Sequence, residues 1–401
     1  MNSLLLYVIS LWLLVVVGIR RQWNHIGTLL LVMYGAIAIF SLLAPKYGNL
    51  LYVEKLDPNT ISYSTVIFLL ISYCIYFSPF FKNKDYFSIK KMDIALNDNY
   101  NKFAVIYIVL CVITIILYIK PMISLLQSGQ WALNRKIMTS DEVIYPYNNF
   151  IEKLIINCTN YFKVLALIVG FLLINKKESK TIGYLVIASV SITEVMTDLY
   201  VSARGSIAVF AMFFIALLLF FFPDINMKNT LRFVIIGLVG LLFIWPIIQA
   251  ITVSRFDNSA SDSVYYYLGQ PIYGISKEIK NLNHHMHGRF AFGTLFGDEK
   301  FPDELSSWVH NFYTFVGWLY ADWGYIGTII VGILISIVFS MIMKKKKYSM
   351  SDLFLIFSYL KLLTDGIFTI GRTRSNMIVI TIVIYIFLKV VIDKHKVVFL
   401  K

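Results

Sequence analysis

The sequence predicts an all-α polytopic membrane protein with about eleven transmembrane helices. Two observations carry this prediction. Hydrophobic residues make up 58% of the 401 residues and charged residues only 15%, which is typical of membrane proteins and not of soluble domains. The apolar residues also recur in runs of about 20, the length at which a helix crosses a bilayer.

The expected spans are separated by polar connections. They cover residues 3–19, 26–43, 61–81, 103–119, 154–174, 181–199, 205–222, 231–253, 325–343, 351–370 and 375–391. When the sides of the membrane alternate, the lysine-rich connections, such as Lys344 to Lys347, all fall on one side. Lysine and arginine concentrate in cytoplasmic loops, so the N-terminus is expected outside and the C-terminus in the cytoplasm.

The first span is expected to remain uncleaved. Residues 4–17 are apolar and are followed by Arg20 and Arg21. A signal peptide has the reverse order, with positive charge before its apolar stretch and small residues after it.

We expect one integral membrane domain, 1–401, with two long external loops. They cover residues 120–153 and 254–321, and the larger one precedes the ninth span. The larger loop is polar and rich in turn signals, so we expect it to fold over the external mouth of the bundle. The chain is apolar or aromatic from Asn311 to Met343, longer than one span needs. A break near Trp323 and Gly324 would leave a re-entrant or interfacial segment before the true span.

Composition also excludes several classes of function. The net charge of +13 comes mostly from lysines of cytoplasmic loops, so no concentrated basic domain exists to bind nucleic acid. Cys74, Cys111 and Cys158 lie in or beside apolar spans, without disulfide or metal-ligand spacing. No Asp-x-Asp pair is present, which disfavours a transferase that holds a nucleotide sugar through a divalent metal.

Most of the arginines lie on the unexpected side of the membrane. Six of the nine are expected outside: Arg135, Arg204, Arg255, Arg289, Arg372 and Arg374. The planar donor fork of arginine suits phosphate and diphosphate better than a lysine does. A phosphorylated lipid, or a similar anion, is therefore the expected ligand, although Arg372 and Arg374 also fit snorkelling to lipid headgroups.

The first candidate constellation lies where the sixth and seventh expected spans meet. Glu194 and Asp198 are four residues apart and share a helix face, and Arg204 opens the next span. Ionisable residues at that depth usually line a polar cavity. The alternative is a simple ion pair of Arg204 with one of the two carboxylates.

The second constellation is the stretch from Ser306 to Gly327. Asn311 and Asp322 share a face if this segment is helical, and His310 is the best candidate for a general base because its unperturbed pKa lies near neutral. Its aromatic residues are interpreted as an interfacial belt rather than as a sugar-stacking surface. These are Trp308, Trp318, Tyr320 and Trp323.

Two further groups have simpler interpretations. His284, His285 and His287 suggest a metal site, but no carboxylate lies at convincing ligand spacing, so solvated histidines are favoured. Lys361 and Asp365 are spaced to pair along one helix face.

Several of these residues together resemble the bacterial O-antigen and capsule repeat-unit polymerases, the Wzy group, and the related O-antigen ligases. The resemblance rests on VSARGS around Arg204, the long external loop, His310 with Asn311, and the run from Tyr320 to Gly327. It covers the C-terminal half in detail and the whole chain in topology.

The resemblance implies a metal-independent membrane glycosyltransferase without a cofactor. Its substrate would be an undecaprenyl-diphosphate-linked oligosaccharide, polymerised at the external face of the bacterial cell (inner) membrane. Residues matching Arg204 and, by position, Arg289 would hold the diphosphate, and the residue matching His310 would act as base. The implied partners are membrane lipid and, in the same pathway, a chain-length regulator and a flippase.

The expected site residues divide by role. The catalytic candidates are His310, Arg204 and Asp322; the substrate-binding candidates are Arg289, Arg255, Arg372, Arg374, Asn311, Glu194 and Asp198, and no metal ligand is expected. A ligase that moves finished glycan to another acceptor remains an alternative. So does a lipid-linked oligosaccharide flippase or transporter, which would need a basic cavity open to both sides.

Overall fold

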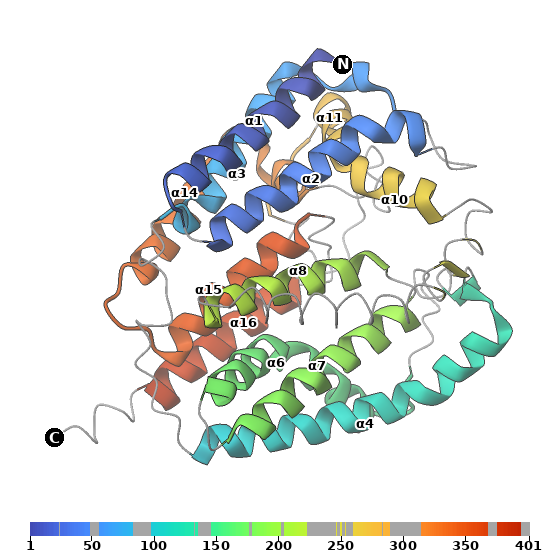
Figure 1. Cartoon of the computed structure of the whole chain (residues 1–401), viewed down its shortest axis with the longest axis vertical. Coiled ribbons are helices and arrows are strands. Elements are labelled where there is room, and N and C mark those ends of the chain that lie inside the picture. Colours follow the sequence, from blue (N-terminus) through green and yellow to red (C-terminus); the bar gives the residue numbers. More distant parts are fainter. Residues whose placement is uncertain are drawn as a thin grey trace. The chain divides into compact units, whose positions relative to one another are not determined.

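The protein is described by a computed structural model whose regular elements are helices (Figure 1). The structure describes residues 1–23, 25–48, 56–82, 98–131, 133–134, 146–175, 179–201, 204–222, 246, 249–250, 253, 260–282, 284–288, 314–367 and 375–393. These residues fall into two compact units. The terminal unit comprises Met1–Met92 and Ser261–Lys401, and the central unit comprises Asp93–Ala260.

The helices of the terminal unit come from both ends of the chain. They are α1 (Asn2–Arg20), α2 (His25–Tyr47), η1 (Pro58–Thr60), α3 (Tyr63–Phe77), η2 (Ser78–Phe80), α10 (Ala260–Gly269), α11 (Pro271–Asn281), α14 (Phe315–Met343), α15 (Met350–Asp365), α16 (Ser375–Phe387) and the π-helix η7 (Leu388–Asp393). The central unit contains α4 (Asp98–Ser128), α6 (Phe150–Asn175), α7 (Lys180–Tyr200) and α8 (Arg204–Phe221).

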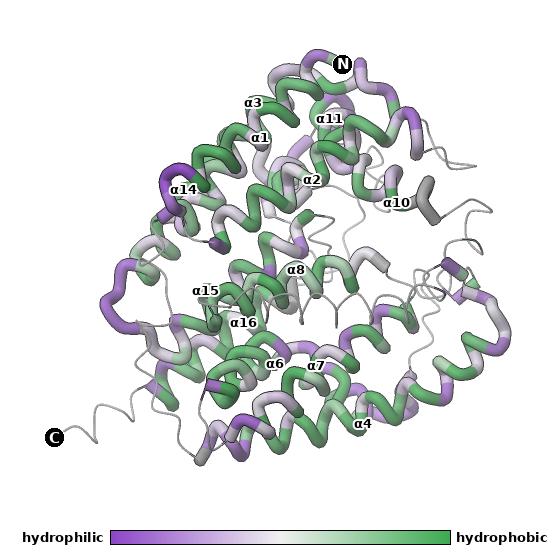
Figure 2. The backbone as a smooth tube through the Cα atoms, viewed as in Figure 1, coloured by the Kyte–Doolittle hydropathy of each residue, from purple (hydrophilic) through white to green (hydrophobic). Residues whose placement is uncertain are grey.

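Seven of the described helices are long and apolar enough to cross a membrane. They are α1, α2, α3 with η2, α4, α6, α7 and α14. Hydrophobic residues occupy the middle of these helices, and hydrophilic residues gather near their ends and in the connections (Figure 2). The chain is therefore a multi-pass helical membrane protein, as its composition predicts.

The remaining expected spans correspond to helices outside this set of seven or lie outside the described residues. The apolar helix α8 covers the span expected at 205–222, and α15 and α16 begin at or next to the residues expected for the last two spans. The span expected at 231–253 lies almost wholly outside the described residues. The orientation of the chain stays a prediction.

The terminal unit is held together by buried tyrosines that donate hydrogen bonds to backbone carbonyls of neighbouring helices. Tyr34 donates to the Leu363 carbonyl at 2.9 Å, and Tyr76 donates to the Thr328 carbonyl at 2.9 Å. Tyr359 in turn donates to the Tyr76 carbonyl at 2.8 Å. A buried hydroxyl without a partner would be costly, so these bonds fix how α2, α3, α14 and α15 pack.

Two bonds define which helix ends meet in the terminal unit. The Ser3 hydroxyl at the start of α1 donates to the Ile61 carbonyl at 2.7 Å, just before α3 begins. Farther along, the Ser336 hydroxyl of α14 donates to the Ile75 carbonyl of α3 at 2.5 Å. The N-terminal ends of α1 and α3 therefore lie together, and α14 runs beside α3.

The segment expected as the larger external loop contains buried helix. α11 packs against α2, α3 and α14, and the Tyr273 hydroxyl donates to the Ser41 carbonyl at 2.9 Å. Proline at the first position of α11 suits a helix start, since its missing N–H would have no partner in the helix. This part of the loop forms part of the packed terminal unit.

In the central unit, α4, α6 and α7 pack against one another. A Cβ on Gly183 of α7 would lie 2.6 Å from the Gly170 carbonyl oxygen of α6. Small residues permit such close approach of membrane helices. The Tyr107 hydroxyl of α4 donates to the Thr159 carbonyl of α6 at 2.6 Å.

The loop expected at 120–153 is shorter in the structure. α4 continues to Ser128 through Pro121, and α6 already begins at Phe150. The extension has a physical reason, because Met122 and Leu125 are buried in a cluster with Trp131. Burial of these apolar side chains favours the added helical turns.

Candidate functional site

The candidate site lies where α14 breaks. Gly324 has φ 63° and ψ −168°, a conformation that residues with a side chain rarely adopt. The predicted break near Trp323 and Gly324 is therefore confirmed, and it separates a buried segment beginning at Phe315 from the apolar segment ending at Met343.

The segment His284–Gly288, called here the histidine strap, covers this break. Its backbone amides satisfy carbonyls at the break: Met286 donates to Ala321 at 3.0 Å, and His287 donates to Asp322 at 2.8 Å. The strap turns tightly, with positive φ at His287 and Gly288. These contacts attach the strap to α14 through its backbone.

Close approach between the strap and α14 depends on two glycines. A Cβ on Gly288 would lie 2.9 Å from the Trp323 ring, and a Cβ on Gly324 would lie 2.7 Å from Nε2 of His285. The ring of His285 also meets the ring of Tyr320 edge-on, with centroids 5.3 Å apart. The three histidines remain exposed.

Two carboxylates are buried near the break in α14. Asp322 is 0% exposed and Glu278, on α11, is 4% exposed. Within the described residues, Oε2 of Glu278 has no hydrogen-bond partner. Burial raises the pKa of Glu278 well above its usual range, and the negative charge of Asp322 raises the pKa further.

An aromatic cluster lies beside the break in α14. Tyr320 and Tyr325 pack edge-to-face at 5.0 Å, and Phe68 of α3 contacts both rings at 5.9 and 4.8 Å. Tyr325 also lies within hydrogen-bonding reach of Ser64, near the start of α3. The site is therefore at the end of the terminal unit that carries the N-terminus.

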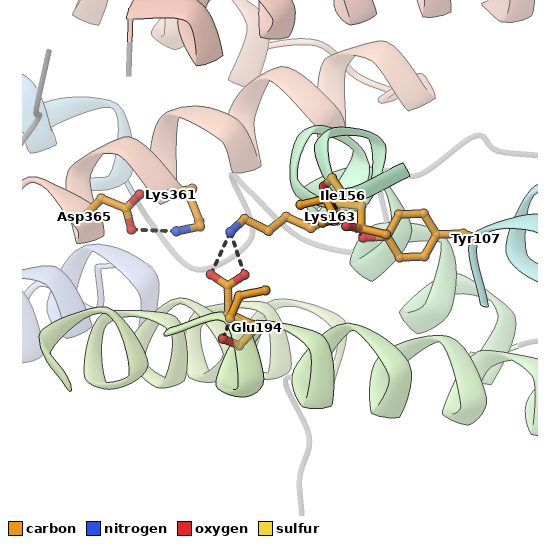
Figure 3. Close-up of polar contacts among 8 residues, drawn as sticks. Tyr107, Ile156, Lys163, Glu194, Lys361 and Asp365 are labelled. Carbon is orange, nitrogen blue, oxygen red and sulfur yellow. Dashed lines mark hydrogen bonds and ion pairs between the residues drawn. The ribbon is translucent and has the colours of Figure 1, made fainter. Parts of the chain in front are cut away.

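A second polar group belongs to the central unit. Nζ of Lys163 on α6 donates to both carboxylate oxygens of Glu194 on α7, at 2.6 and 2.7 Å (Figure 3). Both side chains are largely buried, with 13% and 10% exposure. Lys163 is therefore a cation in direct contact with Glu194, and the predicted ion pair of Arg204 with Glu194 or Asp198 stays a prediction.

The remaining predicted ion pair is confirmed. Nζ of Lys361 lies 2.6 Å from Oδ1 of Asp365 along one face of α15 (Figure 3). It connects adjacent turns of one helix, which is a structural role.

The structure places some predicted site residues and leaves others outside its described part. Arg204 begins α8, as the sequence predicts for the opening of that span, but its side chain is not among those described. Asp198 lies on α7, one turn after Glu194. The others lie outside the described residues: Arg135, Arg255, Arg289, His310, Asn311, Arg372 and Arg374.

The interpretation of the aromatic residues as an interfacial belt is wrong for two of them. Trp318 is 4% exposed and Tyr320 is 5% exposed, because both belong to the buried first segment of α14. A belt residue would face lipid headgroups. Trp323, at the break, is 38% exposed, and Trp308 lies outside the described residues.

Two residues of these polar groups were missed by the sequence analysis. Lys163 sits inside an apolar span, a signal that should have singled it out. Glu278 lies between Lys277 and Lys280 in a loop-like sequence, and nothing in that pattern indicates burial. Among the described residues, no three His, Cys, Asp or Glu side chains gather as a metal site would require.

Comparison with models of known protein families, with curated proteins and with solved structures finds no match. The class that the fold and the site define is a multi-pass helical membrane protein with a buried acidic pair at the broken helix α14.

Proposed function

We propose that this protein is a membrane glycosyltransferase. It polymerises undecaprenyl-diphosphate-linked oligosaccharide repeat units into a surface polysaccharide at the external face of the bacterial cell membrane. The observation that carries the proposal is the position of Asp322. This residue belongs to the Tyr320–Gly327 run that resembles the repeat-unit polymerases, and it is buried beside Glu278 where α14 breaks.

The location of the acidic pair supports the expected side of action. The pair lies at the end of the terminal unit where α1 and α3 begin. With the expected orientation, this end faces outward, since the N-terminus is outside. Lipid-linked repeat units would meet the protein there.

The proposed chemistry is a direct displacement at the anomeric carbon. Arg204, with Arg289, Arg255, Arg372 and Arg374 as further candidates, neutralises the charge that develops on the departing lipid diphosphate. His310 accepts the proton of the acceptor hydroxyl, and Asn311 and Asp322 contact the reacting sugars. Because guanidinium groups replace a metal, the reaction needs no cofactor, and it inverts the anomeric configuration.

The test is the size profile of surface polysaccharide in three strains: one lacking the gene, one complemented with the wild-type gene and one complemented with Arg204→Ala. The proposal expects a ladder only with the wild type, and a single repeat unit in the other two. Long chains that stay on the lipid carrier outside would indicate a ligase. Repeat units that accumulate on the cytoplasmic side would indicate a flippase and would contradict the enzyme.

A further inference from the structure

We propose that Glu278 and Asp322 form a subsite that binds hydroxyl groups of a sugar ring, the ring of the acceptor glycan. This inference rests on the proposed function in taking the ligand to be a glycan. Glu278 is not among the residues that the sequence singled out, and its helix α11 lies between two expected spans.

The first argument concerns Oε2 of Glu278. Its side chain is nearly fully buried, yet Oε2 has no hydrogen-bond partner among the described residues, and Glu278 appears in no described ion pair. Buried carboxylates in folded proteins are normally paired or hydrogen-bonded, because desolvation of the charged group is costly. A carboxylate oxygen in this state is suited to accept a hydrogen bond from a ligand hydroxyl.

The second argument is the contrast with other buried acidic residues of the same unit. Asp352 is 3% exposed, and it accepts from Lys345 at 2.6 Å and from the Ser349 amide at 3.2 Å. Asp365 has Lys361. These carboxylates cap or connect helix turns, whereas Oε2 of Glu278 has no hydrogen-bond partner among the described residues.

The third argument is the nature of the surrounding surface. Tyr320, Tyr325 and Phe68 pack edge-to-face beside the pair, and Trp323 and Tyr325 at the break are 38% and 37% exposed. An acceptor group next to aromatic rings fits a sugar, which has hydroxyls at its edge and apolar C–H groups on its face. The acidic pair would repel a phosphate, so it does not suit the diphosphate end of the substrate.

Both carboxylates are buried in this structure, and the exposed histidine strap lies next to Asp322. The strap is attached to α14 by the two backbone hydrogen bonds to Ala321 and Asp322. A sugar ring that enters from this side displaces the strap, and its hydroxyls then reach both carboxylates.

The experiment measures binding and stability separately from turnover. The full-length protein in detergent is titrated with the repeat-unit oligosaccharide, released from the lipid carrier of a strain that lacks the gene. Tryptophan fluorescence reports binding, because Trp323 borders the site. Glu278→Leu and Asp322→Asn are compared with the wild type, and Asp352→Asn is the matched control, also a nearly fully buried carboxylate.

The proposal expects the dissociation constant to rise about tenfold in Glu278→Leu and Asp322→Asn, the upper range for loss of one hydrogen bond. The control should bind as the wild type does. Glu278→Leu should also keep or raise the apparent melting temperature, since it removes a buried carboxylate whose Oε2 has no partner in the described part of the chain. A purely structural residue would do the opposite and lower it.

Three outcomes overturn the subsite. They are unchanged binding in both variants, equal weakening in Asp352→Asn, and loss of the folded protein in both Glu278→Leu and Glu278→Gln. Polymerisation is measured in parallel with the lipid-linked repeat unit. A wild type that binds the oligosaccharide but makes no polymer contradicts the proposed function and leaves the subsite standing. A wild type that polymerises while both variants bind normally overturns the subsite alone.

Discussion

Glu278 occupies an environment that opposes its charged form. It is buried, and Asp322 adds a like charge, so the pKa of Glu278 in the folded protein lies well above that of the unfolded chain. A carboxyl group with a raised folded pKa contributes stability that is fully present below its unfolded pKa. This contribution is lost as the pH rises through the folded pKa.

The first prediction concerns this pH dependence. Glu278→Gln keeps the shape of the side chain and removes its titration, so the variant should lose less stability than the wild type as the pH rises above the usual pKa of glutamate. At high pH the variant should be more stable by roughly 1–3 kcal/mol, because the wild type must then ionise a buried carboxyl group whereas the amide stays neutral. Thermal unfolding in detergent at several pH values measures the difference. A difference that stays constant with pH would show that Glu278 is not held at a raised pKa.

A second prediction concerns Arg204. Lysine keeps the positive charge but lacks the planar fork that binds diphosphate through two parallel hydrogen bonds. Arg204→Lys should therefore lower turnover by about tenfold or more while the amount of folded protein is unchanged, the rate change expected from losing roughly 1.4 kcal/mol of transition-state stabilisation. The measurement is the rate of polymer formation, with protein quantified in the same membranes. Full activity of Arg204→Lys would remove this residue from the site.

Among the elements, α14 depends most on one residue. Alanine at Gly324 would have to adopt a backbone conformation nearly restricted to glycine, at a cost of about 1–3 kcal/mol. Its Cβ would also lie 2.7 Å from Nε2 of His285 and push against the strap.

The third prediction follows from this geometry. Gly324→Ala should lower the apparent melting temperature and reduce oligosaccharide binding, because a residue with a side chain cannot keep the backbone conformation that positions Asp322, two residues earlier. Gly332→Ala is not a suitable control, since Gly332 packs against Tyr76. Gly129→Ala is a more suitable control. A Cβ at this position would meet no described atom within 4 Å. Because Gly129 also has a positive φ, of 64°, this variant measures the effect of backbone strain away from the site. Equal loss of binding in both variants would refute a specific role of the break.

A fourth prediction concerns the contact between α6 and α7. Lys163→Met removes the cation that contacts both carboxylate oxygens of Glu194, and breaking such a buried pair typically costs about 3–5 kcal/mol. The double variant Lys163→Met/Glu194→Leu replaces both charges with apolar side chains and should recover most of that stability. Thermal unfolding of the single and double variants measures the coupling.

Activity of the double variant then separates two roles of Glu194. Recovery of both stability and polymer formation would make the ion pair structural. Recovery of stability alone would support the predicted role of Glu194 in substrate binding.

At the scale of the whole molecule, the sequence predicted the helical membrane class and most helix positions, because apolar runs of bilayer length leave few alternatives. The broken helix was also predictable, since the apolar run from Asn311 to Met343 exceeds one span and contains Gly324. The ends of α4 and α6 could not be predicted from the sequence, because burial of Met122 and Leu125 depends on residues distant in the chain.

Pairing between distant segments limited the prediction of the site. Asp322 stood out because it interrupts an apolar run. Glu278 did not, because its burial depends on how α11 packs against α2, α3 and α14. The contact between Lys163 and Glu194 could not be predicted either, since the two residues are 31 positions apart and meet only when α6 and α7 pack.

The central claim is that this protein alone joins lipid-linked repeat units without a metal. The most direct test reconstitutes the purified full-length protein into vesicles with the undecaprenyl-diphosphate-linked repeat unit, in the presence of EDTA and without nucleotide sugars. The account predicts a ladder of longer lipid-linked glycans, with one lipid diphosphate released for each bond formed. No ladder, or a ladder that forms only when a divalent metal is restored, would contradict it.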